Sequence, residues 1–322
     1  GPPGRGAVVG SWMRRADGRR ADGGSTMTTV GFIGANGLMG HGMASNIARS
    51  GFDLLYTVHA HAPAGLDELG ARRVDSNAEL GARCDIVVLC ITTAQDVQQT
   101  VTGPDGLLTR PREGLVIVDA ATSEPAVTRE LAAQAAALGV AYADAPLTRG
   151  PAEAEAGRLN TLVGADDEVF ARIEPVLASY CENILRAGPV GAGHTIKLLN
   201  NFCLQAATTA LAESFAVARA AGADPRTLVD VLGRGMFDNQ LLAIMGAALD
   251  GDHERQQFAL GNARKDVRYY TRLAGDVQVA PVVGDGVHEA LSLACSAGYA
   301  ERNVPWVTEA AARINGLPGS ES

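Results

Sequence analysis

The feature that most constrains the fold of this chain is an apolar strand that runs into a glycine-rich turn and then into a helix. The strand is expected at Thr29–Ile33, the turn at 34–40 and the helix over about 38–50. After them, short and largely apolar runs alternate with helical segments, which predicts a doubly wound parallel sheet with both faces covered. Further strands are expected at 54–58, 86–91, 115–119, 140–145 and 160–163, and the helices between them include 94–101 and 126–138.

The character of the sequence changes near residue 188. Gly188, Pro189, Gly191 and Gly193 interrupt the chain there, and no strand is expected beyond them. Helices are expected instead over 194–221, 226–234, 239–249, 259–274, 283–297 and 307–315. We therefore expect an α/β domain over 27–190 and an all-helical domain over 191–322. Residues 1–26 are rich in Gly and Arg without sustained periodicity, and we expect them to be a disordered leader or tag.

Composition excludes several classes of protein. With 47% hydrophobic and 20% charged residues the chain can bury a core, and its net charge of −9 argues against a nucleic-acid partner. Its apolar runs are too short to cross a bilayer, so no membrane partner is expected. The five cysteines are odd in number and form no C-x-x-C pair, which favours a reducing, cytoplasmic compartment. His59 and His61 are the one close histidine pair, so we expect no metal site.

The glycine-rich turn predicts a dinucleotide site. Glycines in a strand–turn–helix unit permit a tight turn and close approach of the backbone to a pyrophosphate, which then lies at the positive N-terminus of the helix. The spacing departs from G-x-G-x-x-G, because Asn36 stands at the second glycine position or one residue is inserted. A purely structural turn is the alternative. The expected cofactor contacts are Gly34, Ala35, Asn36, Gly37, Leu38, Met39 and Gly40.

The choice between NAD and NADP stays open. An acidic residue at the end of the second strand would bind the ribose hydroxyl of NAD, and an arginine there would accept the phosphate of NADP. Asp53 has the expected separation from the turn, but it begins the strand and so lies at the wrong end. His59, His61, Arg72 or Arg73 could meet a phosphate, although each also fits a solvated surface position.

Lysine is almost absent from the chain. Of the 27 basic residues 25 are arginine, and the two lysines are Lys197 and Lys265. A desolvated lysine can lose its proton and an arginine cannot, so the two lysines are either chance retention or sites that need a titratable amine. Lys197, Asn200 and Asn201 share one face of the helix expected over 194–221. A solvated polar face is the alternative to a cleft that holds a ligand.

The chemistry of a positioned amine fits hydride transfer. Reduction of a carbonyl group places negative charge on its oxygen, and an ammonium group can stabilise that charge and deliver a proton. Desolvation brings the pKa of a lysine toward neutrality, where such proton transfer is most efficient. A neighbouring asparagine can orient the substrate by hydrogen bonding without adding charge.

Five segments, in order, resemble the motifs of the β-hydroxyacid dehydrogenase family, which includes 3-hydroxyisobutyrate dehydrogenases and tartronate semialdehyde reductases. The resemblance covers about residues 28–315, and the segment around Lys197 is its most specific part. The segments are Gly31-Phe32-Ile33-Gly34 with Leu38-Met39-Gly40, Asp119 to Pro125 (family D-x-S-T-x-x-P), Asp144 to Gly150 (family D-A-P-V-S-G-G), Gly191-x-Gly193-x-x-x-Lys197-x-x-Asn200-Asn201, and Phe258 to Lys265-Asp266.

The resemblance implies a Rossmann-type domain, a nicotinamide cofactor, and oxidation of a small β-hydroxy acid or reduction of its semialdehyde. It implies that Lys197 is the general acid and base, that Asn201 helps to hold the substrate, and that Lys265 lies by the nicotinamide. It also implies a homodimer or homotetramer built through the helical domain. The residues implied to line the cofactor path are Ile91, Thr92 and Thr122.

The sequence departs from the family at the substrate end. Ala121 replaces a serine, Thr148 replaces the serine of S-G-G, and Arg149 replaces the glycine after it. The family holds a substrate carboxylate with backbone amides and that serine, so Thr122, Thr148, Arg149 and Gly150 are expected around a small anionic substrate. Arg149 would add a bidentate clamp for a second carboxylate or a sulfonate, as in a sulfolactaldehyde-reductase-like enzyme.

Several alternatives stay open. Arg149 could point to solvent, or it could pair with Glu153 or Glu155. An imine reductase on the same scaffold would carry Asp or Tyr in place of Lys197, and a non-catalytic dinucleotide-binding module would have no need of the lysine. A decarboxylating sugar-phosphate dehydrogenase would need a larger C-terminal domain than the one expected here.

Overall fold

The structure is a computed structural model that describes residues 27–58 and 63–319, so the expected leader over 1–26 lies outside the described residues. The strands are β1 (Thr29–Ile33), β2 (Asp53–Thr57), β3 (Arg72–Arg73), β4 (Ile86–Leu89), β5 (Val116–Asp119), β6 (Ala141–Asp144), β7 (Leu147–Thr148), β8 (Leu159–Gly164) and β9 (Cys181–Gly188). They form one sheet in the order β3-β2-β1-β4-β5-β6-β8-β7, with β9 paired to β8. The parallel order of β1 to β6 is that of a Rossmann sheet, which confirms the expected fold class.

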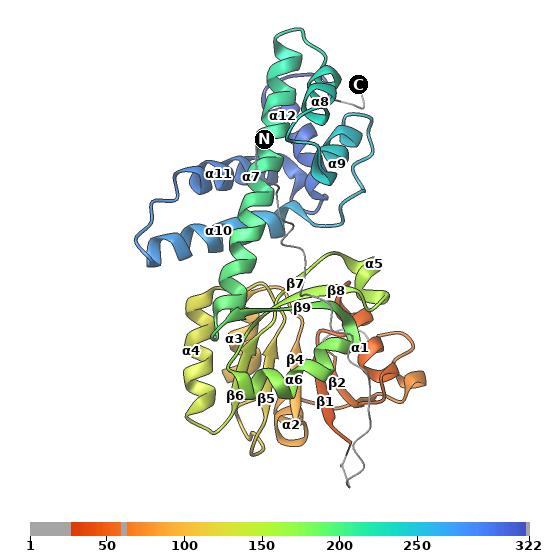
Figure 1. Cartoon of the computed structure of the whole chain (residues 1–322), viewed down its shortest axis with the longest axis vertical. Helices are drawn as coiled ribbons and strands as arrows, with labels where there is room; N and C mark the ends of the chain where they lie inside the picture. Colours follow the sequence, from red (N-terminus) through yellow and green to blue (C-terminus); the bar gives the residue numbers. More distant parts are fainter. Residues whose placement is uncertain (1–26, 59–62, 320–322) are drawn as a thin grey trace, which may run out of the picture.

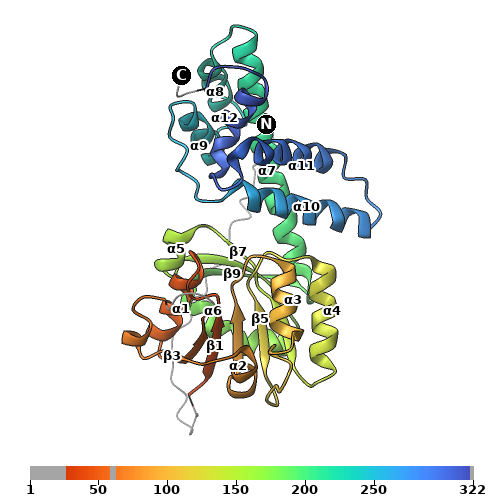
Figure 2. The ribbon, with the colours of Figure 1, turned by 180° about the vertical axis from the view of Figure 1, so that it is seen from behind.

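Helices cover both faces of this sheet (Figures 1 and 2). One face carries α2 (Asn77–Arg83), α3 (Ala94–Thr102) and α4 (Pro125–Ala136), and the other carries α1 (Gly40–Arg49), α5 (Pro151–Glu155) and α6 (Asp167–Tyr180). Successive side chains of a strand point to opposite faces, so β1 contributes to two cores. Val30 and Phe32 belong to the core under α1 and α6, whereas Ile33 belongs to the core under α2, α3 and α4.

One side of the sheet differs from the expected parallel arrangement. β8 runs antiparallel to β6 and β7 and parallel to β9, so the sheet is mainly but not wholly parallel. Periodicity does not reveal β9, because Cys181 is its one buried residue and polar side chains such as Glu182 and Asn183 interrupt the apolar pattern. β3 and β7 have two residues each, too few for any periodicity to show.

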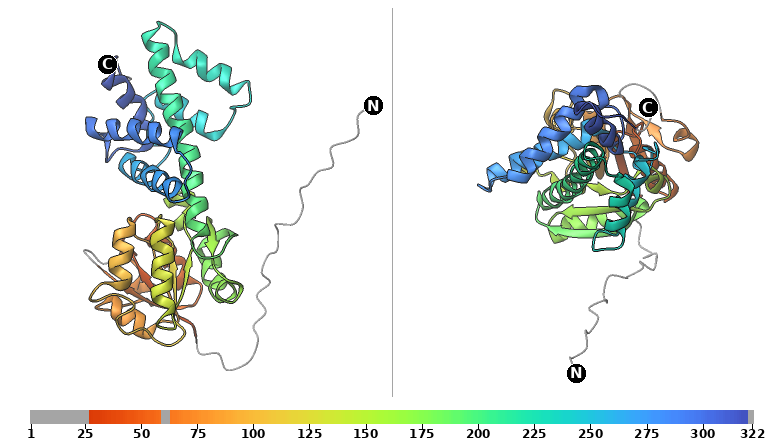
Figure 3. Two further views of the ribbon diagram at one scale, coloured as in Figure 1. Left: turned by 90° about the vertical axis from the view of Figure 1, so that its left-hand side faces the viewer. Right: turned by 90° about the horizontal axis from the view of Figure 1, so that it is seen from above.

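Beyond Gly188 the described residues form helices and no named strand. α7 (Ala192–Ala220) begins beside the carboxyl end of β6 and runs through the whole helical part (Figures 1 and 3). Leu211 and Phe215 of α7 pack into a third core shared by the other helices. These helices are α8 (Pro225–Gly233), α9 (Gln240–Ala248), α10 (Leu260–Asp276), α11 (Val282–Ala294) and α12 (Val307–Ile314). Residue 190, between β9 and α7, stays our proposed domain boundary.

The described residues hold neither a membrane-spanning helix nor a cluster of metal ligands. None of their helices combines the length and the apolar character needed to cross a membrane. Among the same residues, no group of three or more His, Cys, Asp or Glu side chains is placed to hold a metal ion.

Candidate active site at the junction of the sheet and the long helix

The turn after β1 depends on two glycines. Gly34 has a φ of +95°, and a Cβ built there would lie 2.1 Å from the carbonyl oxygen of Cys90, the residue directly after the neighbouring strand β4. A Cβ at Gly40 would lie 2.0 Å from the carbonyl oxygen of Gly34. Both distances are far below van der Waals contact, so any side chain at either position would force the turn open. Glycine is therefore required here by close backbone approach as well as by conformation.

The N-terminus of α1 is suited to an anion. Its N-cap residue, Met39, makes no side-chain capping bond, and the first turn carries no acidic residue. The first amides of a helix lack partners within the helix and carry partial positive charge, so an uncapped start favours a phosphate. The turn therefore fits the pyrophosphate of a dinucleotide. Gly37 and Leu38, also expected to contact the cofactor, lie exposed in the same turn.

The residues on and near β2 leave the preference between NAD and NADP open. Asp53 is the first residue of β2, at the end away from the glycine turn, and it forms an ion pair of 2.7 Å with Arg72. Arg72 is therefore already engaged, whereas Arg73 forms no ion pair within the described residues. The other two candidates for phosphate binding, His59 and His61, lie outside the described residues.

Lys197 lies on the second turn of α7 with its side chain half-buried. No hydrogen bond or ion pair to its amine is present among residues 27–58 and 63–319. Burial lowers the pKa of Lys197 below its ordinary value of 10.5; the carboxylate of Asp266 raises this pKa and the charge of Lys265 lowers it. The arrangement leaves a titratable amine that is free to exchange a proton with a ligand.

Asp266 organises the polar face beside Lys197. It lies on α10 with 2% of its surface exposed. Its Oδ2 accepts a hydrogen bond of 2.7 Å from Nδ2 of Asn201, and its Oδ1 lies 3.2 Å from Nζ of Lys265. Asn201 Oδ1 in turn accepts a hydrogen bond of 3.1 Å from Nδ2 of Asn200. The orientation of the Asn201 amide is therefore fixed from both ends.

The helical part is joined to the sheet part beside these groups. Lys265 Nζ donates a hydrogen bond of 2.6 Å to the carbonyl oxygen of Thr92, in the loop after β4 that also contains Ile91. The amide of Ala94 donates to the hydroxyl of Tyr269 on α10 at 3.2 Å. The structure thus brings both lysines, Asn201 and the loop after β4 to one junction, although they are far apart in the sequence.

Thr122 lies in the β5–α4 loop, half-buried, directly after Ala121. The Ala121 amide donates a hydrogen bond of 3.0 Å to Oδ1 of Asp119 at the end of β5. The Ala121 carbonyl oxygen lies 3.0 Å from Nε2 of His194, on the first turn of α7. The loop that carries Thr122 is therefore fixed on one side by β5 and on the other by the helix of Lys197.

Asp144 holds the start of α7. Its Oδ1 accepts from the amide of Gly191 at 2.6 Å, and its Oδ2 accepts from the amide of His194 at 2.7 Å. A Cβ at Gly193 would lie 2.2 Å from the Leu162 carbonyl oxygen, so glycine there lets the first turn of α7 press against β8. These contacts explain why the sequence has glycine in this turn, before the lysine.

The expected anion-binding segment is engaged in internal hydrogen bonds. Thr148 Oγ1 accepts from Nδ2 of Asn160 at 3.0 Å, and the Gly150 amide donates to Oε2 of Glu153 at 3.1 Å. Glu153 stands in the first turn of α5, so it satisfies the amide that precedes the helix. The placement of Thr148 and Gly150 near a substrate stays a prediction.

Arg149 is held by partners other than the two carboxylates named as alternatives to a substrate contact. Its guanidinium donates to the carbonyl oxygen of Arg158 and forms an ion pair with Glu182 on β9. It pairs with neither Glu153 nor Glu155. Arg149 also has a φ of +76°, a conformation in which only one other described non-glycine residue is found. Its proposed contact with a substrate requires the guanidinium to leave Glu182.

The sequence reasoning did not single out three functional candidates. Asp144 and Asp266 stand inside the resembling motifs, and both are buried in the structure. His194 has no exposed surface and stands three residues before Lys197. A buried polar side chain requires a partner, and the partners here come from distant segments.

Comparison with known proteins shows the family. A family model described as the NAD binding domain of 6-phosphogluconate dehydrogenase matches residues 29–188, and one described as NAD-binding of NADP-dependent 3-hydroxyisobutyrate dehydrogenase matches residues 191–308. The 3-hydroxyisobutyrate dehydrogenase of Pseudomonas aeruginosa is 35% identical over 217 residues, which cover 67% of this chain and 72% of that protein. The chain belongs to the β-hydroxyacid dehydrogenase family.

Two other relatives support this placement. The 2-(hydroxymethyl)glutarate dehydrogenase of Eubacterium barkeri is 35% identical to this β-hydroxyacid dehydrogenase over 210 residues, 64% of this chain and 68% of that protein. The solved structure of Mycobacterium tuberculosis 3-hydroxyisobutyrate dehydrogenase with L-serine superposes with a TM-score of 0.79 at 25% identity, covering 88% of this chain and 99% of that chain. This likeness confirms the expected Rossmann fold with a helical C-terminal part, and the two family models confirm the expected nicotinamide dinucleotide cofactor.

Proposed function

We propose that this β-hydroxyacid dehydrogenase moves hydride between NAD or NADP and a short β-hydroxy acid or its semialdehyde, with Lys197 as general acid and base. The carrying observation is an amine without hydrogen-bond partners among the described residues, half-buried and with a lowered pKa, beside the Asn201–Asp266 pair. The second lysine bonds to the loop after β4, in the same region. These groups suit a carbonyl oxygen that gains or loses a proton.

The residues divide the chemistry among them. A nicotinamide dinucleotide, when bound, supplies or accepts the hydride. In reduction the ammonium of Lys197 donates its proton to the carbonyl oxygen, and in oxidation the neutral amine accepts the proton of the substrate hydroxyl. Asn201, oriented by Asp266, holds the substrate without adding charge. Lys265 keeps the loop at Thr92 against α10.

Substitution of Lys197 tests the proposal. Purified protein is assayed with NAD+ and NADP+ against a panel of short β-hydroxy acids. Removal of a general acid and base costs about 10²- to 10⁴-fold, so Lys197→Ala should lower kcat by that factor while nucleotide affinity, measured by fluorescence titration, stays unchanged. Lys197→Arg keeps the charge and cannot give up its proton, so it should be as inactive as Lys197→Ala. Wild-type turnover by Lys197→Ala would contradict the mechanism.

The alternative functions have discriminating features in the same assay. An imine reductase would act on cyclic imines and not on semialdehydes, and Lys197 stands where Asp or Tyr is expected in such an enzyme. A non-catalytic module would bind nucleotide and turn over no substrate. The geometry favours neither the imine reductase nor the non-catalytic module, because neither function requires the amine of Lys197.

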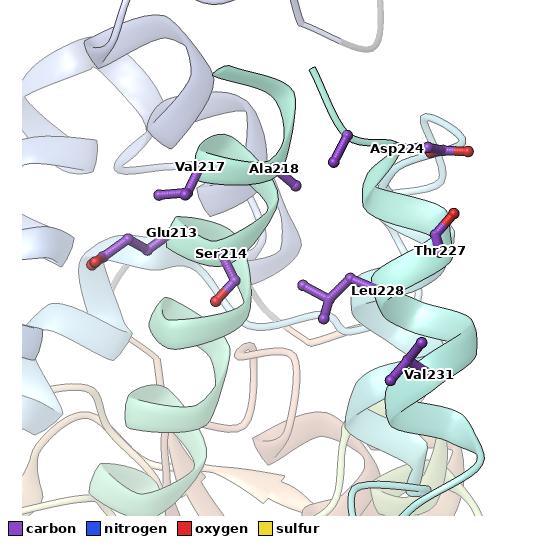
Figure 4. Close-up of a pocket in the computed structure, with 9 residues that line it drawn as sticks. Glu213, Ser214, Val217, Ala218, Asp224, Thr227, Leu228 and Val231 are labelled. Carbon is purple, nitrogen blue, oxygen red and sulfur yellow. The ribbon is translucent and has the colours of Figure 1, made fainter. Parts of the chain in front are cut away.

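We further propose a homodimer or homotetramer formed through the helical part. A groove of about 500 Å³ lies between α7 and α8, and its side chains include Val217, Leu228 and Val231 (Figure 4). Val217 and Val231 expose 60% and 62% of their surface. A second copy of the chain would cover this apolar surface, which supports the assembly implied by the family.

A reducing, cytoplasmic compartment is proposed because the described cysteines are all free thiols.

A further inference from the structure

His194 connects the β5–α4 loop to the helix that carries Lys197. Its fully buried imidazole stands on the first turn of α7. Nε2 lies 3.0 Å from the carbonyl oxygen of Ala121, and Nδ1 lies 2.7 Å from Oγ1 of Thr128 on α4. A carbonyl oxygen can only accept, so Nε2 carries a proton and donates it. In the neutral ring Nδ1 is then an acceptor that faces the Thr128 hydroxyl, whose oxygen also lies 3.1 Å from the carbonyl oxygen of Glu124.

Two buried aspartates extend this connection into a closed set of contacts. Asp119 and Asp144 are register partners at the carboxyl ends of β5 and β6. Asp119 binds the amide of Ala121, and Asp144 binds the amides of Gly191 and His194. The path from Ala121 through His194 to Asp144 therefore returns through the sheet to Asp119. Because all of these groups are buried, the loss of any one contact leaves an unsatisfied polar group that is costly.

We propose that His194 is a positioning residue that fixes Lys197 relative to the loop at Ala121 and Thr122, a role that rests on the proposed function of Lys197. Lys197 follows His194 by three residues on the same side of α7. Thr122 follows Ala121 directly and is expected on the cofactor path. The Nε2 bond therefore sets the distance between the amine and the loop. A misplacement of about 1 Å in such a site can cost about 10²-fold in rate.

Two amide substitutions of His194 test the contacts of its two ring nitrogens separately. The amide nitrogen of Gln reaches the position of Nε2, so His194→Gln keeps a donor for Ala121. The amide of Asn reaches the position of Nδ1, so His194→Asn keeps the Thr128 contact and loses the bond to Ala121. We expect His194→Asn to lower kcat about 10- to 100-fold, and His194→Gln to stay within about three-fold of wild type. Neither variant should change the Kd of NADH or NADPH, because the glycine turn is untouched.

If His194 has a structural role alone, we expect another result. The two variants would then lose similar thermal stability and show equal kcat per folded molecule, or a loss confined to KM. Either outcome overturns the proposal. Activity is normalised to the fraction of folded protein, measured by its unfolding transition, so that instability does not pass for a loss of positioning.

Amide hydrogen exchange gives a readout that needs no substrate. If the Nε2 bond couples the loop to α7, saturating NADH or NADPH should slow exchange in residues 192–199 of wild type and His194→Gln, and not of His194→Asn. Equal nucleotide-dependent protection in all three proteins, or none in wild type, overturns the coupling. Absence of turnover by wild type on every β-hydroxy acid would instead contradict the proposed function, and the exchange result would still decide the role of His194.

Discussion

At Lys197, burial and two opposite charges act on the same proton. Burial and the charge of Lys265 favour the neutral amine, whereas the carboxylate of Asp266 favours the ammonium. The motif around Lys197 predicted the amine and its asparagine neighbours from the sequence. It did not predict that Asp266, 65 residues from Asn201, fixes that asparagine. Local spacing reports which residues share a helix face, and tertiary packing decides which charge faces them.

The direction of these effects predicts a pH dependence. Oxidation of a hydroxy acid needs the neutral amine, so its rate should rise with pH through the pKa of Lys197, which lies below 10.5. Asp266→Asn removes the charge that raises this pKa, so the rising limb should move to lower pH. Asp276→Asn, at the far end of α10, is the matched control and should leave the limb in place. A limb that moves to higher pH in Asp266→Asn would contradict the assignment.

The ion pair of Arg149 offers a test of its proposed substrate role. If Arg149 can reach a substrate, Glu182→Gln frees its guanidinium and should raise kcat/KM for dicarboxylate over monocarboxylate β-hydroxy acids several-fold. When Arg149→Gly is combined with Glu182→Gln, that rise in kcat/KM should disappear. The substitution also places glycine at a φ of +76°, which glycine adopts without strain. Unchanged selectivity in both variants would remove Arg149 from the pocket.

At the scale of elements, the sequence predicts the strands, turns and helices whose pattern lies within one continuous segment. The β1 strand, its glycine turn and α1 are contiguous, and six helices of the C-terminal part follow their apolar periodicity to within three residues. β9 pairs with β8 but exposes most of its side chains, so no apolar alternation marks it. The anchoring of α7 by Asp144 joins residues 47 positions apart. Such contacts depend on the completed sheet and have no local pattern.

Two glycines with similar conformations test the glycine turn. Gly34 and Gly51 have φ values of +95° and +86°, but a Cβ at Gly34 would meet the Cys90 carbonyl oxygen while a Cβ at Gly51 would meet nothing within 4 Å. Both alanine substitutions carry a backbone cost of about 1–2 kcal/mol. Gly34→Ala should in addition weaken NADH or NADPH binding more than about tenfold, because the turn must open.

Fluorescence titration and thermal unfolding measure the two effects separately. Gly51→Ala should lose stability alone and keep the nucleotide Kd of wild type. Equal affinity in the two variants would show that the turn at Gly34 does not contact the nucleotide.

At the scale of the whole molecule, α7 is the element that joins the two parts. Its first turn is bound to the sheet by Asp144, and its later turns form the core of the helical part. Lys197 therefore lies near the end of α7 that contacts the sheet. The groove between α7 and α8 lies near the opposite end of the same helix (Figure 4). Assembly and chemistry are thus assigned to different ends of one helix.

A charge placed in the groove should change assembly without changing chemistry. Val231→Asp puts a carboxylate into the proposed contact, so sedimentation should show a shift toward the monomer, with kcat retained per folded chain. Leu138→Asp, on an exposed residue after α4, is the control and should sediment like wild type. A Val231→Asp variant that keeps the wild-type assembly would place the interface elsewhere.

The scarcity of lysine has a practical consequence for this molecule. Apart from the α-amino group, acylating reagents meet two side-chain nitrogens, of which Lys265 is bonded to the Thr92 carbonyl oxygen and Lys197 is not. Covalent footprinting with such a reagent, read by mass spectrometry, therefore reports mainly on the junction where these two lysines lie. A ligand that shields that location reveals its own occupancy in the peptide that contains Lys197.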